Sequence, residues 1–215
     1  MSGPGPGGIL DVAALTDHLR AGGAALFPTD TLPALATRPE AAGLLWRLKE
    51  RPAHKPLILM GADLGQLQEA LAAPWHEAWL AQARSGWPGA LTLVLPHSGP
   101  LAEALHPGGA SLGLRVPACE QARELLRRTG PLATTSANRS GDPPARDAAE
   151  AGRLFPELPR LAPLPWPPGS GQASTVLAWE PRQATEAGGT GPMGWRVLRA
   201  GAPLAAAGGG EPCSG

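Results

Sequence analysis

The apolar positions of the chain follow two patterns, a helical spacing of three to four residues and short continuous runs. The helical spacing begins at residues 9–21, where Ile9, Val12, Leu15 and Leu19 share one face and two glycines follow. A proline at the start or a glycine at the end delimits later stretches of the same kind. The helices predicted in this way cover residues 9–21, 39–50, 63–72, 75–84 and 119–129.

The continuous apolar runs are short enough to be buried strands. Some of them follow each other without a helix between them. The pattern therefore predicts an α/β fold with a mixed parallel and antiparallel sheet, not a purely doubly wound one. The predicted strands are residues 24–27, 56–60, 90–95, 112–116, 131–135, 173–179 and 194–200.

The length of 215 residues suits one sizeable domain. Glycine and proline, 29 and 26 residues, gather near the two ends and in a late loop, whereas the middle is strongly patterned. We expect one domain over residues 9–201, with flexible termini at 1–8 and 202–215 and a proline-rich loop at 163–171.

Charge and cysteine content narrow the classes of protein. The 18 basic and 18 acidic residues balance, which argues against a dedicated nucleic-acid arm. Cys119 and Cys213 are too few for a disulfide framework, which favours a reducing cytoplasm. The chain shows neither an apolar run of about 18 residues nor a secretory signal, so we expect no membrane association.

The string TTSANRSG at residues 134–141 places small hydrogen-bonding side chains directly after a predicted strand. Such residues often cap a helix. The next helical pattern begins only after Pro143-Pro144, which is too late for Ser136 to cap it. A loop rich in small donors that ends in glycine suits close approach to an anion or a nucleotide. The string therefore predicts a phosphate-binding loop, although it is not a Walker sequence.

Three other stretches carry candidate chemistry, each with a structural alternative. Residues 29–31 (Thr-Asp-Thr) follow a strand and fit a side-chain-capped turn or a binding loop. The cations Lys49, Arg51 and Lys55 fit a clamp for a polyanion, or a helix end whose dipole they complement. Arg115 interrupts an apolar strand and needs either water, an acidic partner or an anionic ligand.

Several common sites are not indicated. The five histidines lack metal-ligand spacing and no CxxC is present, so no metal site in the protein is predicted. No GxSxG elbow occurs either. Trp75 and Trp79 are four residues apart, so we expect them to pack together on a helix face.

The order of the strings PTDTLPALA, LKERPAHKPLIL, SGWPGALTLVL, LGLRVP, TTSANRSG, STVLAW and VLRAG resembles the successive signatures of the Sua5/YciO/YrdC family. The resemblance runs from about residue 9 to residue 201. It implies a twisted mixed sheet flanked by helices, with a concave ligand cleft, in a single-domain form.

The resemblance also implies an activity, in which L-threonine, bicarbonate and ATP give threonylcarbamoyl-AMP and pyrophosphate for modification of adenosine 37 in tRNA. It implies a Mg²⁺ held mainly by the ATP phosphates, a downstream tRNA threonylcarbamoyl transferase machinery and a possible tRNA contact. The implied threonine-binding residues are Thr31, Arg115, Thr134 and Ser174. The implied ATP-binding residues are Arg51, Lys55, Ser111, Ser136, Asn138 and Arg199, with Lys49, Arg51 and Lys55 as the catalytic cations.

One segment departs from the family string, which is close to PTDTVYGLG. Here Pro33 replaces the aromatic residue and Ala34 and Ala36 replace glycines. Because alanine resists positive φ, a reshaped loop is expected if those positions need it. The alternative function is thus a catalytically altered member that binds RNA or a nucleotide. The intact cations favour the synthase.

Overall fold

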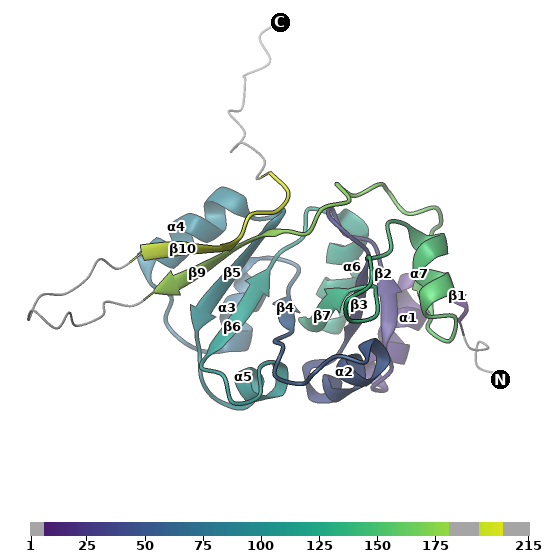
Figure 1. Cartoon of the computed structure of the whole chain (residues 1–215), viewed down its shortest axis with the longest axis horizontal. Coiled ribbons are helices and arrows are strands. Elements are labelled where there is room, and N and C mark those ends of the chain that lie inside the picture. The colour runs from purple at the N-terminus through teal and green to yellow at the C-terminus, as the bar shows by residue number, and fades with distance from the viewer. Residues whose placement is uncertain (1–6, 181–193, 204–215) are drawn as a thin grey trace, which may run out of the picture.

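The computed structural model describes residues 7–180 and 194–203, and these form one sheet with helices on both faces (Figure 1). The strands are β1 (Ile9–Leu10), β2 (Ala25–Phe27), β3 (Ala34–Thr37), β4 (Ile58–Met60), β5 (Leu91–Pro96), β6 (Ser111–Arg115), β7 (Leu132–Ser136), β8 (Arg160–Leu161), β9 (Thr175–Glu180) and β10 (Gly194–Arg199). The helices are α1 (Val12–Arg20), the 3₁₀ turn η1 (Pro39–Ala41), α2 (Gly43–Lys49), α3 (Leu64–Leu71), α4 (Glu77–Gly86), α5 (Pro100–Leu105), α6 (Glu120–Thr129) and α7 (Ala148–Leu154).

The sheet mixes parallel and antiparallel pairs, which confirms the predicted fold class. Its order is β1-β8-β2-β3-β7-β4-β6-β5-β9-β10. Strand β7 runs antiparallel to both β3 and β4, whereas β4 and β6 are parallel. The strands β3, β7, β4 and β6, which are far apart in sequence, therefore lie side by side at the centre.

Local sequence explains where the helices begin and end. Asp11, Asp63 and Asp147 are N-caps, and their carboxylates accept from backbone N–H groups at 2.8–2.9 Å. Gly130 ends α6 with φ at 82°, a conformation that glycine adopts without steric cost. The boundaries of α3 and α6 lie within one residue of the predicted ones.

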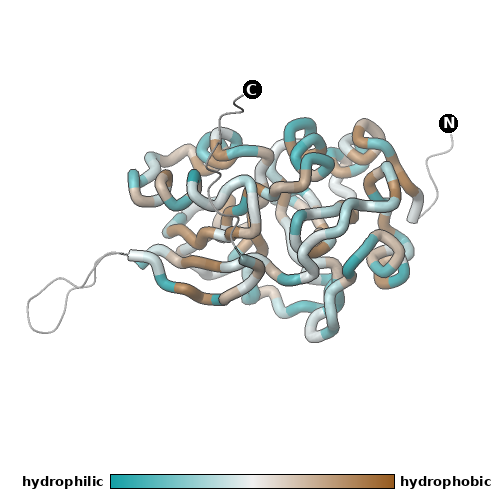
Figure 2. Tube along the Cα trace, turned by 90° about the horizontal axis from the view of Figure 1, so that it is seen from above, coloured by the Kyte–Doolittle hydropathy of each residue, from teal (hydrophilic) through white to brown (hydrophobic). Residues whose placement is uncertain are grey.

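The hydrophobic core lies on both faces of the sheet, because successive strand side chains point to opposite sides. Leu26 and Leu35 pack on one face with residues of α2, α3 and α7. Phe27 and Ala36 pack on the other face with α1 and α6. Along the helices, hydrophilic and hydrophobic positions follow each other around the turns (Figure 2), as amphipathic helices require.

The sequence-based assignment needs corrections at several places. The predicted helix 9–21 is strand β1 followed by α1, because Ile9 and Leu10 pair with β8, 151 residues later. The predicted helix 39–50 is divided into η1 and α2. The strands β3 and β8 and the helix α5 were not predicted, and for α7 the sequence indicated only a helical pattern after Pro144, without bounds. They are short, and pairing with distant strands rather than periodicity defines β3 and β8.

Both ends of the predicted domain, residues 9 and 201, lie within the described residues, whereas most of the termini predicted to be flexible, 1–8 and 202–215, lie outside them. Gly7 donates to the carbonyl of Glu157 at 3.1 Å, and Ala202 is buried and donates to Ala173 at 2.8 Å. Within the described ranges, no helix is long and apolar enough to cross a membrane. The cytoplasmic location stays a prediction.

The expected contact between Trp75 and Trp79 is confirmed, with ring centroids 6.4 Å apart. Trp79 lies on α4, but Trp75 precedes that helix. The two rings therefore meet without sharing a helix face.

Candidate functional site

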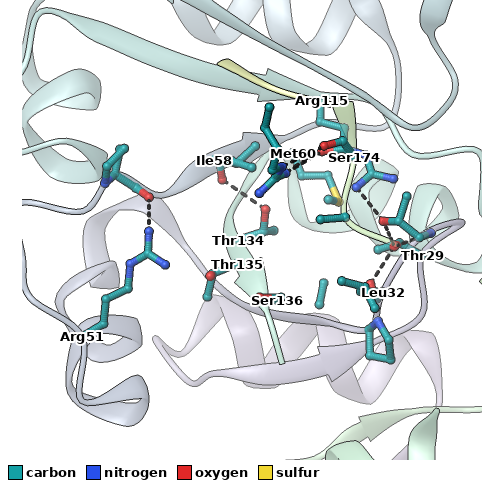
Figure 3. Close-up of a pocket in the computed structure, with 16 residues that line it drawn as sticks. Thr29, Leu32, Arg51, Ile58, Met60, Arg115, Thr134, Thr135, Ser136 and Ser174 are labelled. Atoms are coloured by element: carbon teal, nitrogen blue, oxygen red, sulfur yellow. Dashed lines mark hydrogen bonds between the residues drawn. The ribbon is translucent and has the colours of Figure 1, made fainter. Parts of the chain in front are cut away.

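A cavity of about 160 Å³ lies over the central strands of the sheet. Directly paired residues of neighbouring strands line it, and such pairs project to the same face. Figure 3 shows Arg51 at one end, Arg115, Ser174 and Thr29 at the other, and the β7 residues between them. The pairs that form its floor are Ala34 with Ser136, Ile58 with Thr134 and Met60 with Arg115.

Arg115 is buried, with 5% of its surface exposed, and three groups hold its guanidinium. Nη2 donates to Asp30 Oδ1 at 2.9 Å, Nη1 to Thr31 Oγ1 at 2.8 Å and Nε to the Gly89 carbonyl at 3.2 Å. Burial lowers the pKa of Arg115, and the Asp30 carboxylate partly opposes this shift. A guanidinium has five N–H bonds, so two remain for a ligand.

The turn that carries Thr31 is held from within and from outside. Thr29 Oγ1 donates to the Leu32 carbonyl at 2.7 Å and accepts from the Thr31 N–H at 3.1 Å, which is the predicted side-chain-capped turn. The proline-rich loop packs on this turn, because a Cβ on Gly169 would lie 2.3 Å from the Thr31 carbonyl oxygen. The turn is thus capped by its own side chain, and its residues Thr29 and Thr31 also line the cavity.

Ser174 lies on the same side of the cavity and is 3% exposed. Its Oγ shares a hydrogen bond of 2.8 Å with Thr92 Oγ1. Arg199 donates to the Ser174 carbonyl from Nε at 3.1 Å and from Nη2 at 2.9 Å. Arg199 therefore positions Ser174 and brings a second guanidinium to this end of the cavity.

Arg51 lines the opposite end. Its Nη2 donates to the Pro56 carbonyl at 2.9 Å, whereas its buried Nε has no hydrogen-bond partner among the described residues. Burial lowers the pKa of Arg51, which means that its charge is incompletely solvated. An anion at this position would restore the missing interactions.

The string TTSANRSG forms the end of β7 and the polar loop, which we define as residues 136–142. Thr134, Thr135 and Ser136 line the cavity. Ser136 Oγ donates to Asn138 Oδ1 at 2.6 Å, and Asn138 Nδ2 donates to the carbonyls of Arg139 and Asp142 at 2.8 Å. The Asn138 amide therefore fixes the loop from inside.

Lys49 is 1% exposed and extends from α2 into the polar loop. Its Nζ donates to the carbonyls of Ser136 and Asn138 and to Asn138 Oδ1 at 2.6, 2.5 and 2.8 Å. Burial, with the nearby Arg51 charge, lowers the pKa of Lys49 to about 7. The three oxygen acceptors oppose this shift, because they match the three N–H bonds of an ammonium group.

The structure brings most of the predicted site residues to one cavity. Those that line it are Thr31, Arg51, Arg115, Thr134, Ser136, Ser174 and Arg199. The other four do not line it: Asn138 lies in the polar loop and bonds Lys49, Lys55 is exposed, and Ser111 lies at the far end of β6 from Arg115. The roles of all eleven residues in ligand binding stay predictions.

Sequence reasoning did not assign Asp30 to the site, although Asp30 is the ionic partner of Arg115. The available signal was its position between Thr29 and Thr31, and the burial of Arg115 was the missing information. Thr92, which contacts Ser174, carried no signal, because it looks like an ordinary strand threonine.

The site has the chemistry of an anion receptor. Three guanidinium groups and several hydroxyls line the cavity, and the described residues that line it include no carboxylate. Planar guanidinium forks and hydroxyl donors suit carboxylates and phosphates. Across residues 7–180 and 194–203, no group of three or more His, Cys, Asp or Glu side chains gathers around a possible metal position.

Comparison with known proteins finds a matching family model and relatives of one name. A family model described as "Telomere recombination" (Sua5_yciO_yrdC) matches residues 17–188. A threonylcarbamoyl-AMP synthase of Stenotrophomonas maltophilia (strain K279a) is 41% identical over 162 residues, which cover 71% of this chain and 82% of the relative. One of Neisseria gonorrhoeae (strain ATCC 700825 / FA 1090) is 38% identical over 146 residues, covering 66% and 77%.

Solved structures of Sua5 and YciO proteins share the fold of this chain. Sua5 of P. abyssi complexed with L-threonine superposes with a TM-score of 0.71 at 30% identity, over 78% of this chain and 50% of that chain. This chain thus spans about half the length of that Sua5 protein. YciO of E. coli shares the fold, with a TM-score of 0.67 at 21% identity over 88% of both chains. The chain belongs to the Sua5/YciO/YrdC family, as the order of its motifs predicted.

Proposed function

We propose that this protein is a threonylcarbamoyl-AMP synthase, which converts L-threonine, bicarbonate and ATP to threonylcarbamoyl-AMP and pyrophosphate. The observation that carries the proposal is a single cavity with Arg115 at one end and Arg51 at the other. A carboxylate and a polyphosphate are two anions that such guanidinium groups bind. The relatives that match this chain at 34–41% identity bear the same name.

The Arg115 end suits the amino acid. The two free N–H bonds of Arg115 would hold the threonine carboxylate, and the hydroxyls of Thr31 and Ser174 are neighbouring hydrogen-bonding groups. Thr134, on the cavity floor, would lie beside the substrate. The P. abyssi relative was solved with L-threonine bound, which supports this substrate.

The Arg51 end suits the phosphates of ATP, with Ser136 and the polar loop beside it. ATP is larger than a cavity of about 160 Å³, so part of the nucleotide would extend beyond it. Lys55 and Ser111 stay predictions for that part. The described residues offer no cluster that fits a protein-held metal. A Mg²⁺ that assists the reaction would be held mainly by the ATP phosphates.

The chemistry follows from holding these substrates together. The neutral amine of threonine takes up CO₂ derived from bicarbonate, forming a C–N bond and releasing a proton. A carbamate oxygen then attacks the α-phosphorus of ATP, and the bond to the bridging oxygen breaks so that pyrophosphate leaves. The guanidinium groups reduce the repulsion between the two anions, and binding in one cavity replaces a multi-molecular encounter.

The product would serve a tRNA threonylcarbamoyl transferase machinery that modifies adenosine 37. A direct contact with tRNA is a further proposal. The replacement of family glycines by Ala34 and Ala36 was the argument for an RNA-binding protein without synthase activity. The structure weakens that argument, because neither position needs a glycine. Ala34 and Ala36 lie in β3, and the non-glycine residues with positive φ in the described ranges are Glu50 and Ala72.

The test is pyrophosphate release with each substrate omitted in turn. We expect turnover only with threonine, bicarbonate and ATP together, and a large loss in Arg51→Met. The matched control is Arg84→Met, which removes an exposed arginine outside the site. Release that does not depend on threonine, or no release with all three substrates, would argue against the proposal.

A further inference from the structure

Lys49 has no N–H bond left for a phosphate. An ammonium group carries three N–H bonds, and Nζ already has three oxygen acceptors at 2.5–2.8 Å. The side chain is also 1% exposed and does not line the cavity, unlike Arg51 two residues later. A cation in this state acts on its neighbours in the protein.

The neighbours of Lys49 belong to the polar loop, and other bonds join the loop to the same helix end. The Ser140 N–H donates to the Lys49 carbonyl at 2.8 Å. Arg139 Nη1 donates to the Leu48 carbonyl at 3.4 Å and forms an ion pair with Glu50 at 2.5 Å. The ion pair of Arg139 with Glu50 is exposed and therefore contributes little. The buried Lys49 ammonium is the central connection.

The connection reaches the cavity through Ser136. Lys49 Nζ bonds the Ser136 carbonyl directly, and it shares the Asn138 Oδ1 acceptor with the Ser136 hydroxyl. The orientation of the Asn138 amide is determined, because its Nδ2 faces two carbonyl oxygens. Loss of the ammonium would leave buried oxygens unpaired and release both groups that orient Ser136.

We propose that Lys49 is a positioning residue, which holds Ser136 and the polar loop in their phosphate-binding arrangement and does not itself contact the phosphates. The identity of the ligand rests on the proposed function. The arrangement of the loop in the free protein does not.

The first experiment follows amide hydrogen exchange in the free protein. We expect Lys49→Met to raise exchange of the 138–142 amides at least ten-fold, while Arg51→Met, the matched loss of a cation that lines the cavity, leaves it unchanged. If Lys49→Met does not fold, Lys49→Gln, which keeps two N–H bonds without the charge, and Asn138→Ala are measured instead. Wild-type exchange in the lysine variant would overturn the proposal.

The second experiment is a double-mutant cycle for pyrophosphate binding. If Lys49 acts through Asn138, Lys49→Met/Asn138→Ala binds no more weakly than the weaker single variant. Lys49→Met should also raise the KM for ATP about ten-fold or more and leave the KM for threonine within two-fold. Independent, multiplying losses for Lys49 and Asn138 would identify Lys49 as a direct ligand. A wild type that does not bind pyrophosphate would count against the proposed function, whereas exchange would still decide the role of Lys49.

Discussion

Arg115 shows how a single residue combines structural and binding functions. Its charge is neutralised by Asp30, whose side chain is 19% exposed, and Thr31 and Gly89 complete three of its five hydrogen bonds. A fully paired arginine would only stabilise the fold. The two remaining N–H bonds leave room for a carboxylate on a guanidinium that is already oriented.

Replacing Arg115 with methionine should raise the KM for threonine strongly. Loss of a desolvated charge pair costs about 2–5 kcal/mol, which is about 30-fold or more in affinity. The KM for ATP should stay within two-fold, because Arg115 lies at the other end of the cavity from Arg51. Steady-state pyrophosphate release with each substrate varied measures both. Equal losses for the two substrates would contradict this assignment.

Asp30→Asn should destabilise the protein even without ligand. Removing one partner of a buried ion pair costs about 3 kcal/mol or more, because the other charge stays buried. Urea unfolding of the wild type and the variant measures the difference. The control is Glu124→Gln, which removes an exposed ion pair with Arg128 and should change stability much less. Similar midpoints for both variants would show that water already solvates Arg115.

At the scale of elements, the turn at 29–31, strand β3 and the proline-rich loop form the amino-acid end of the site together. The loop approaches the turn so closely that only glycine fits at position 169. It also bonds the turn twice, from Ser170 N to the Asp30 carbonyl and from Gly171 N to the Thr31 carbonyl. The position of Thr31 is thus set by a segment about 140 residues away.

Gly169→Ala should therefore impair threonine use. The added Cβ would lie 2.3 Å from the Thr31 oxygen, so the loop or the turn must move, with a stability cost of about 1–3 kcal/mol. We expect a higher KM for threonine. Gly43→Ala is the control, since its Cβ would meet its nearest neighbour at 3.6 Å. If Gly169→Ala leaves the threonine kinetics unchanged, the proline-rich loop does not position Thr31 for threonine binding.

Strand β3 also decides the effect of the family departure. Ala34 and Ala36 are buried strand residues paired with Ser136 and Thr134. Neither alanine has a positive φ, so the replacement of glycine causes no backbone strain. We expect the wild type to use threonine, and Ala34→Gly/Ala36→Gly to lose about 1–2 kcal/mol of stability, since strand glycine costs about 0.5–1 kcal/mol. Urea unfolding and pyrophosphate release with threonine, serine and glycine test both statements. If the wild type releases no pyrophosphate with threonine while Pro33→Tyr/Ala34→Gly/Ala36→Gly does, the replacements in this chain have abolished synthase activity.

At the scale of the whole molecule, the cavity joins the centre of the sheet to its β9–β10 end. Arg51, Arg115 and Arg199 come from the first, middle and last parts of the chain. A ligand that bridges these groups would add contacts between segments that are far apart in the sequence. Ligand binding should therefore stabilise the fold as one unit.

ATP at 100 times its Kd should raise the free energy of unfolding by about 2.7 kcal/mol, and the Tm by about 5–10 °C. Arg51→Met at the same ATP concentration should shift much less. Thermal unfolding with and without ATP measures this. An equal shift in the variant would place the phosphates away from Arg51.

Local signals in the sequence were enough to predict most of the helices and the central strands. Apolar periodicity and caps such as Asp63 and Gly130 located most helices, and apolar runs located the central strands. The family membership followed from the order of short motifs, and so did seven of the sixteen residues that line the cavity. Arg115 was recognised because a charge inside an apolar strand needs a partner, whatever the fold.

Which polar groups face the cavity and which face each other depends on how distant segments pack. Lys49 and Arg51 are both cations and stand two positions apart in the sequence. Three oxygens of the polar loop enclose Lys49, whereas Arg51 lines the cavity. Asp30 became the partner of Arg115, and β1 and β3 became strands, through pairing across large sequence separations. Sequence patterns report which side chains are polar or apolar, whereas burial and partners depend on packing between distant segments.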